Sequence, residues 1–258
     1  MKHSIVYSAD GSHTLKLSEF DECFHSSNGA YTEAEHIYIK CGIEFLWEKT
    51  GCTSLVIYDI GLGTALNCMA ALVWQQNLII NGLHFPHIIY KGIEKYPISM
   101  EEASMLNFPE YIAKHNPHIP LRLLETWFET IHSSIWEEEV NINPHFTLIK
   151  HKGDISTVDG RYFSNSSINA SINSYSKSAN TVIMYDTFSP ATQPHLWDVE
   201  IFKKIAENAA VGTILTTYCS KGIVKQALRD AGFSIERLQG PPGKRHILRA
   251  TLSYLPHI

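Results

Sequence analysis

Four acidic residues each follow an apolar run that is typical of a buried β-strand. They are Asp59, Glu94, Asp154 and Asp186, and helical patterns separate most of the apolar runs from one another. In an open α/β sheet the carboxyl ends of parallel strands meet at one edge, where such folds bind their ligands. The spacing therefore predicts a group of carboxylates at one sheet edge, able to accept hydrogen bonds or to balance a positive charge.

A glycine turn, "DIGLGTALN" (59–67), follows the first of these strands. Gly61 and Gly63 allow a tight turn and a close approach to a ligand, because neither carries a Cβ. A dinucleotide fingerprint would place a third glycine where Leu66 stands. Asp59 would repel a pyrophosphate, whereas it would attract the ammonium and sulfonium groups of S-adenosylmethionine. The turn therefore favours a methyl donor as the cofactor.

Other polar residues extend this predicted cofactor site. Glu94 is placed to accept hydrogen bonds from both hydroxyls of a ribose, a position that NAD would use equally well. Asp154 is placed to accept a hydrogen bond from an adenine amino group. Thr64 and Asn67 could bind the methionine end of the cofactor, although Thr64 could instead cap the following helix.

The stretch "MYDTFSPATQPHLW" (184–197) predicts the place where the second substrate is held. Its apolar strand delivers Asp186 into a loop that Pro190 stiffens and that exposes Phe188. Trp197 is more typical of a core anchor at the start of a helix. We therefore expect an acceptor-binding loop with Asp186 as its functional carboxylate.

The elements that must position these residues alternate between strand and helix, which predicts a doubly wound α/β sheet. "TEAE" beginning at Thr32 predicts a capping box that opens a helix to about residue 49, and residues 99–140 predict helices interrupted by prolines. A helix is expected over about 197–208, and Ser220 is expected to cap the next one. "FSIERL" and "HILRATLSYL" predict a closing β-hairpin.

Two regions are expected in the chain. Residues 1–31 predict a small N-terminal β extension, and residues 32–258 predict one α/β domain. Within that domain, residues 164–180 are dominated by serine and asparagine and predict a flexible loop.

Composition narrows the functional classes. The chain has 258 residues, 44% hydrophobic and 18% charged, with a net charge of −5, which excludes disorder and an overall positive field. Five cysteines lack CxxC spacing and the paired histidines of "HFPH" and "HNPH" flank prolines, so no metal site is expected. The absence of an apolar signal or membrane-length run predicts a cytoplasmic protein without membrane contact.

An RNA partner would need a local basic patch on this acidic chain. Lys221, Lys225 and Arg229 recur at helical spacing, and Lys244 and Arg245 lie in the turn of the predicted hairpin. We take these five residues as a candidate RNA-binding surface. The alternative is an ordinary solvated helix face.

Seven stretches form a recognisable set of motifs, namely "EFDECFHSSNGAYTEAEHIYI", "DIGLGTALN", "GIEKYPI", "GDI", "YDTFSPATQPHLW", "TYCSKGIVKQALRDAGF" and "GKRHIL". Together they resemble the methyltransferase half of the MnmC family of bacterial tRNA-modifying proteins, and the resemblance covers most of the chain. The chain departs from the family at five positions. Leu62 replaces a phenylalanine, Ala65 and Thr187 each replace a glycine, Gln193 replaces an asparagine and Asp59 replaces a glutamate.

The resemblance implies a Rossmann-like class I fold and S-adenosylmethionine as the cofactor. It implies N-methylation of the aminomethyl group of 5-aminomethyl-2-thiouridine at the tRNA wobble position, in the anticodon region, giving 5-methylaminomethyl-2-thiouridine. Asp186 would then orient the amine and stabilise the charge that develops on its nitrogen. The family's flavin-dependent oxidase half has no counterpart here, so no flavin is expected in this chain.

Three alternatives remain at the level of sequence. The first is a class I methyltransferase that acts on another amine, in a small molecule or a protein, since Thr187 and Gln193 alter the acceptor loop. The second is a catalytically silent scaffold for RNA modification, which would have no need for all four strand-end acids. The third is a nicotinamide oxidoreductase.

Overall fold

The computed structural model describes residues 3–18, 22–163 and 180–254. The predicted flexible loop at 164–180 therefore lies outside the described residues, apart from Asn180.

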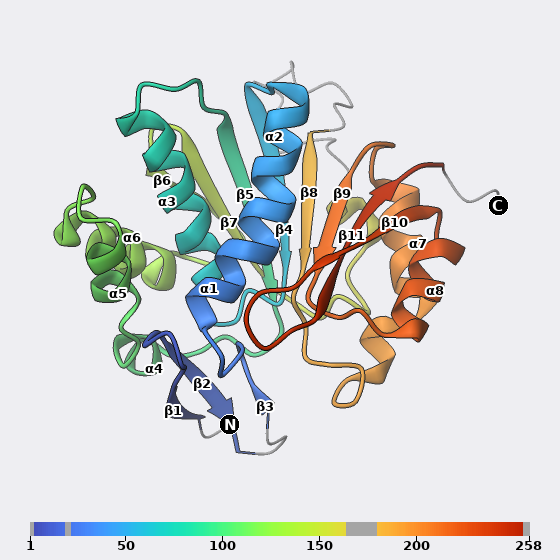
Figure 1. Ribbon diagram of the computed structural model, residues 1–258, viewed down its shortest axis with the longest axis horizontal. Helices are drawn as coiled ribbons and strands as arrows, with labels where there is room; N and C mark the ends of the chain where they lie inside the picture. Colours follow the sequence, from blue (N-terminus) through green and yellow to red (C-terminus); the bar gives the residue numbers. More distant parts are fainter. Residues whose placement is uncertain (1–2, 19–21, 164–179, 255–258) are drawn as a thin grey trace.

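A mixed eight-stranded sheet forms the centre of the molecule (Figure 1). Its strands follow the order β10-β11-β9-β8-β4-β5-β7-β6, and the five central strands are parallel. The predicted doubly wound α/β fold and the predicted hairpin of β10 and β11 are confirmed. The strands are β4 (Ser54–Ile60), β5 (His87–Glu94), β6 (Glu139–Asn143), β7 (Phe146–Lys152), β8 (Thr181–Tyr185), β9 (Ile214–Thr217), β10 (Phe233–Gln239) and β11 (His246–Leu252).

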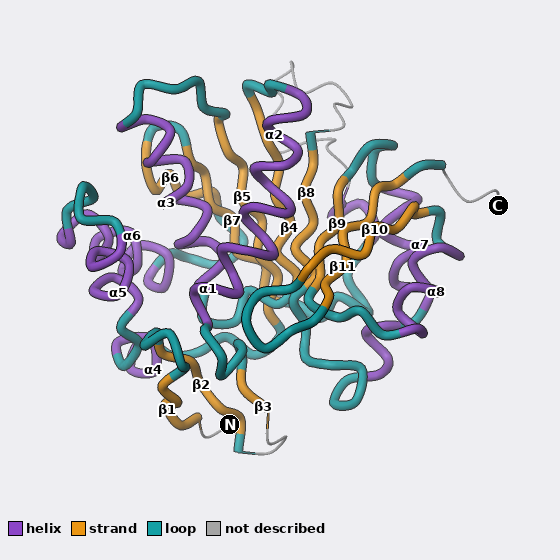
Figure 2. Tube along the Cα trace, viewed as in Figure 1, coloured by secondary structure: helices purple, strands orange, loops and turns teal. Residues whose placement is uncertain are grey.

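Helices cover both faces of this sheet and enclose two apolar cores (Figure 2). One core lies under the N-terminal helices and α3, α5 and α6, and the other under α7 and α8. Burial on both faces explains why the central strands are almost continuously apolar. The helices are α1 (Ala30–Ala34), the π-helix η1 (Glu35–Glu44), α2 (Phe45–Thr50), α3 (Leu66–Ile80), α4 (Met100–Ser104), α5 (Phe108–His115), α6 (Leu121–Ser133), the 3₁₀ turns η2 (Gly160–Phe163) and η3 (Pro194–Trp197), α7 (Val199–Asn208) and α8 (Gly222–Asp230).

The expected N-terminal β extension forms a separate three-stranded antiparallel sheet of β1 (His3–Tyr7), β2 (His13–Leu17) and β3 (Glu22–Cys23). It lies beside the carboxyl ends of the central strands (Figure 1). Phe24, just after β3, packs so close to Gly63 that a Cβ on that glycine would lie 2.9 Å from the Phe24 ring. The extension is therefore part of the wall around the ligand-binding edge.

Two predicted helix caps were wrong. The first helix begins at Ala30 with Gly29 as its N-cap, two residues before the expected capping box. Thr32 instead donates two hydrogen bonds to the carboxylate of Asp10, from its backbone N at 3.1 Å and its hydroxyl at 2.8 Å. Helix α8 has Lys221 rather than Ser220 at its N-cap, without a side-chain cap bond. Thr32 is therefore used in a contact with the N-terminal extension instead of capping the first helix.

The helical expectation for residues 99–140 was correct only in part. Three helices fill it to Ser133, but residues 139–143 form the edge strand β6, antiparallel to β7. The helix expected from Trp197 is divided in the structure. Trp197 ends a 3₁₀ turn and is buried, and α7 begins at Val199.

Candidate active site

A cavity of about 700 Å³ opens at the carboxyl ends of the central strands. Its walls come from the β4–α3 turn, the ends of β5, β7 and β8, the segment after β3 and the β10–β11 turn. Seven of the residues predicted from sequence line it, namely Gly61, Gly63, Glu94, Asp154, Asp186, Phe188 and Lys244.

The glycine turn is tied to both neighbouring strands. The backbone N–H groups of Gly61 and Leu62 both donate to the carbonyl of Ile93 at 3.1 Å. Gly61 has φ +95°, and a Cβ at this position would lie 2.6 Å from the carbonyl oxygen of Asp186. Only glycine tolerates this close approach of backbones together with a positive φ. The turn therefore holds the end of β8, and with it Asp186, in a fixed place.

Glu94 is fixed by two backbone donors at the end of β5. The N–H of Gly63 donates to its Oε2 at 2.9 Å, and the N–H of Tyr96 donates to its Oε1 at 2.8 Å. Burial nevertheless raises the pKa of this carboxyl above its usual range. Each oxygen keeps lone-pair capacity toward the cavity, so the oriented carboxylate can accept hydrogen bonds from a pair of hydroxyls.

Asp154 lies beyond the end of β7 and is held by its neighbours. Lys95 contacts its Oδ2 at 2.8 Å, and the backbone and hydroxyl of Ser156 donate to its Oδ1 at 2.8 and 2.7 Å. Burial alone would raise the pKa of Asp154, but these donors lower it to about 2. Two apolar side chains, Ile93 and Ile155, line the same cavity and are almost fully buried.

Asp59 does not line the cavity, although the sequence suggested that it would face the cofactor directly. It is fully buried below the wall, where Tyr90 donates to its carboxylate at 2.5 Å and Asn67 at 3.4 Å. Burial raises the pKa of Asp59 to about 8, with Asp186 adding to the shift. Thr64 and Asn67 are also buried behind the lining, and His25 lies 2.7 Å from the Thr64 hydroxyl. These three residues support the cavity wall from below.

Asp186 projects from the end of β8 into the cavity and is held by two donors. The Tyr38 hydroxyl donates to its Oδ1 at 2.6 Å, and Asn67 donates to its Oδ2 at 2.9 Å. Burial raises the pKa of Asp186 to about 7, against the lowering effect of these two hydrogen bonds. Asp186 can therefore change its protonation state near neutral pH while its position stays fixed.

The loop after Asp186, predicted to bind the acceptor, contacts the N-terminal extension. Glu22 accepts a hydrogen bond from the backbone of Ser189 at 3.1 Å and another from the Thr192 hydroxyl. The Phe188 ring makes an edge contact with Phe24 at 5.4 Å between centroids. Trp197 donates to the Phe188 carbonyl at 2.9 Å, and the predicted loop residue Pro190 is buried outside the cavity lining.

Sequence reasoning missed several residues around Asp186. Tyr38 reaches it from the π-helix η1, a geometry that is rare and often found at functional sites. Glu33, from the first turn of α1, and Tyr218, after β9, line the cavity beside it. The motif "NGAYTEAEHIYI" pointed to the helix but not to these side chains, because helical periodicity does not show which neighbour a residue faces.

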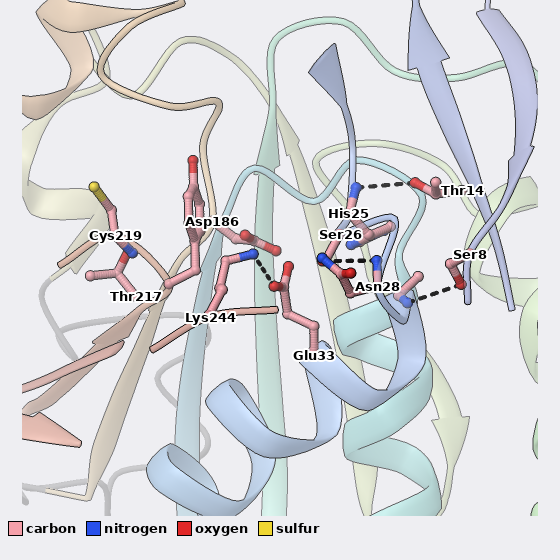
Figure 3. Close-up of polar contacts among 12 residues, drawn as sticks. Ser8, Thr14, His25, Ser26, Asn28, Glu33, Asp186, Thr217, Cys219 and Lys244 are labelled. Atoms are coloured by element: carbon pink, nitrogen blue, oxygen red, sulfur yellow. Dashed lines mark hydrogen bonds and ion pairs between the residues drawn. The ribbon is translucent and has the colours of Figure 1, made fainter. Parts of the chain in front are cut away.

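The predicted basic patch divides into two groups. Lys221 and Arg229 are exposed on α8 and Lys225 is half-buried there. Lys244 instead turns into the cavity and forms an ion pair with Glu33 (Figure 3). Its neighbour Arg245 is exposed. A lysine that is committed to a buried glutamate is not in the position expected of a surface phosphate contact.

Two features are absent from residues 3–18, 22–163 and 180–254. Within them, no group of three or more histidine, cysteine or acidic side chains is arranged to hold a metal ion. Among the helices of the described chain, none is long and apolar enough to cross a membrane.

The chain is similar to several known proteins in sequence and in fold. Residues 164–253 match a family model described as S-adenosyl-L-methionine-dependent methyltransferase. The bifunctional protein MnmC of tRNA 5-methylaminomethyl-2-thiouridine biosynthesis from Pseudoalteromonas atlantica is 23% identical over 96% of this chain and 33% of its own length. The protein of the same name from Burkholderia mallei is 26% identical over 95% of this chain and 35% of its own length. The chain thus spans about a third of these relatives.

Solved structures show the same fold. MnmC2 from Aquifex aeolicus superposes with a TM-score of 0.70 at 20% identity, covering 100% of this chain and 72% of that one. Spermidine synthase from Thermotoga maritima superposes with a TM-score of 0.50 at 8% identity, covering 99% and 73%. The fold is that of a class I S-adenosylmethionine-dependent methyltransferase, and over nearly its whole length the chain is similar to the methyltransferase part of MnmC proteins.

Proposed function

We propose that this chain methylates the aminomethyl group of 5-aminomethyl-2-thiouridine at the wobble position of tRNA, with S-adenosylmethionine as the donor. The observation that carries the proposal is Asp186, a carboxylate fixed by Tyr38 and Asn67 in the same cavity as Glu94 and Asp154. Similarity to proteins named for this biosynthesis supports the choice of acceptor.

The residues present fit S-adenosylmethionine. The cavity volume of about 700 Å³ lies within the range usual for cofactor sites. Glu94 would bind the ribose hydroxyls, Asp154 the adenine amino group, and Ile93 and Ile155 would flank the ring. The bound cofactor supplies an electrophilic methyl group on a sulfonium. Gly61 and Gly63 keep the turn tight against Asp186 and Phe24 where the methionine end would lie, and Asp59 would act through Asn67 rather than by contact.

Asp186 would prepare the amine for attack. An alkylamine has a pKa of about 10 and is nucleophilic only after it has lost its proton. With the pKa of Asp186 raised to about 7, proton transfer from the ammonium is uphill by about 4 kcal/mol, roughly half of the cost to an ordinary aspartate. Once this proton has passed from Asp186 to solvent, the carboxylate would orient the nitrogen and stabilise the positive charge that returns to it during attack. Holding the partners in line supplies a further ~7–11 kcal/mol in favourable cases.

The tRNA would approach over the acceptor loop, with Phe188 and the buried Pro190 shaping the place of the flipped base. Lys221, Lys225, Arg229 and Arg245 would contact the phosphate backbone, with Lys244 facing the acceptor inside the cavity. Because tRNA is the substrate, we place the reaction in the cytoplasm. We further propose that residues 1–31 act as an extension that completes the acceptor side of the domain at 32–258.

Methyl transfer from labelled S-adenosylmethionine tests the proposal. Wild-type protein should label tRNA that carries 5-aminomethyl-2-thiouridine and should not label the same tRNA without the modification. Asp186→Ala should abolish most of the labelling while it still binds the cofactor. Cofactor binding without any labelling of this tRNA would overturn the acceptor, and labelling of a small amine instead would assign the chain to another substrate.

A further inference from the structure

The cavity already contains one primary alkylammonium group, the Nζ of Lys244. This group forms an ion pair with Glu33 (Figure 3). It lies 5.2 Å from the centroid of the Tyr218 ring, and all three residues line the cavity with Asp186. A protonated aminomethyl group is chemically the same kind of ion. The structure therefore shows how this cavity binds a group of the proposed acceptor's class.

Glu33 is a buried acidic residue, which is unusual for a charged side chain. Its side chain is 8% exposed, and a buried carboxylate is strongly destabilising unless a cation or several donors balance it. The ion pair that the structure shows for Glu33 is with Lys244, from the other end of the chain. Asp186 lies in the same cavity, so an arriving ammonium would meet two carboxylates there.

Lys244 is able to leave this place without a rearrangement of the fold. The β10–β11 turn that carries it is anchored by its backbone: Gly243 packs so closely on Asn28 that a Cβ would lie 2.2 Å from the amide nitrogen, and His36 lies 2.9 Å from the Gln239 carbonyl. The Lys244 side chain is 24% exposed, and its ammonium group stands at the end of a flexible four-carbon stem. Its ammonium can therefore turn to solvent while the turn stays docked.

We propose that Glu33 is a second acceptor-binding carboxylate, specific for an amine that arrives protonated, and that Lys244 occupies its place until the acceptor displaces it. This inference rests on the proposed function. Glu33 binds the incoming ammonium, and Asp186 receives its proton and directs the free amine. Lys244 keeps the buried Glu33 balanced while the site is empty, and it acts as a competitor within the chain.

Glu33→Gln tests the first half, because it keeps the shape and removes the charge. The KM for aminomethyl tRNA should rise at least tenfold, kcat should change by less than about threefold, and the dissociation constant of S-adenosylmethionine should not change. Glu200→Gln, in the exposed pair with Lys203 on α7, is the matched control and should leave all three values at the wild-type level. Equal KM values for Glu33→Gln and wild type would overturn the proposal.

Lys244→Met tests whether Lys244 competes with the acceptor for Glu33. The expected change is a lower acceptor KM, which a loss of folding would not produce. If Lys244 occupies Glu33 for nine-tenths of the time, its removal should lower the acceptor KM by up to about tenfold. If Lys244 instead contacts an RNA phosphate, the KM should rise and the salt slope of binding should fall by about one. That second outcome would overturn the proposal. Lys203→Met is the matched control and should show neither effect.

A binding measurement separates this inference from the proposed function. Calorimetry with S-adenosylhomocysteine present should show that wild type binds the nucleoside 5-aminomethyl-2-thiouridine more tightly than its neutral 5-hydroxymethyl analogue, and that Glu33→Gln loses this preference. If wild type keeps the preference but labels no tRNA, the function fails and the ammonium site stands. If wild type labels tRNA and the preference is absent or survives Glu33→Gln, the site fails and the function stands.

Discussion

The two sides of the cavity are assembled in different ways. The proposed cofactor side, defined by Gly61, Gly63, Glu94 and Asp154, is built from turns that follow neighbouring parallel strands. The proposed acceptor side, defined by Glu22, Glu33, Tyr38, Asp186 and Lys244, brings together segments from both ends of the chain and its middle. The first side follows from the fold class alone. The second exists only once the N-terminal extension and the C-terminal hairpin have docked.

The largest expected effect is a loss of rate without a loss of cofactor affinity, which would show that the two sides have different functions. Asp186→Ala should lower kcat by about 10²–10⁴-fold, because it removes both the proton acceptor and the group that directs the amine. The dissociation constant of S-adenosylmethionine should stay at the wild-type value, measured by calorimetry. A loss of cofactor affinity as large as the loss of rate would show that the two sides are not separate.

Glu94→Ala is the reciprocal change on the cofactor side. It removes a charged acceptor of hydrogen bonds, each worth about 1.5–3 kcal/mol, so the cofactor dissociation constant should rise roughly 10–100-fold for each bond that is lost. The rate at saturating cofactor should fall much less than in Asp186→Ala. Glu139→Gln, on the exposed edge strand β6, is a suitable control. The prediction is wrong if Glu94→Ala binds the cofactor as wild type does.

Asp59 connects the two sides from below, and its environment predicts a pH dependence of stability. Its pKa is raised by burial from 3.8 to about 8, so the folded state binds more protons than the unfolded state between these values. The sign follows from linkage: the free energy of unfolding should decrease as pH rises from about 4 to about 8. Asp59→Asn should flatten this slope in urea titrations at several pH values, whereas Glu200→Gln should not.

The smallest effect concerns the helix start that the glycine turn leads into. Ala65 has φ +59°, a left-handed conformation that costs an alanine about 1–2 kcal/mol. Ala65→Gly relieves this strain and should cost about 1–2 kcal/mol less stability than Ala71→Gly, in the regular interior of α3. Urea unfolding measures both variants. Equal losses would mean that the turn does not strain Ala65.

The strand-end carboxylates were predictable because two local rules were enough. Buried parallel strands need apolar residues on both faces, and their carboxyl ends must share one edge, so Glu94, Asp154 and Asp186 could be brought together from spacing alone. The glycine turn was recognisable because only glycine permits the approach of Gly61 to the Asp186 carbonyl. Asp59 belongs to the same pattern, yet spacing could not tell that it lies below the surface.

The amino-acid sequence by itself determined the α/β sheet, its hairpin and the sheet edge that carries the cavity, since these follow from periodicity and glycine positions. Only the tertiary structure decided the burial of Asp59, the edge strand β6, the inward turn of Lys244 and the contact of Glu22 with the acceptor loop. The physical reason is that the partners in these ion pairs and hydrogen bonds are distant in the sequence and become neighbours only in the folded chain. Lys244 and Glu33 are far apart in the chain, and the residues around either one do not indicate that the two form an ion pair.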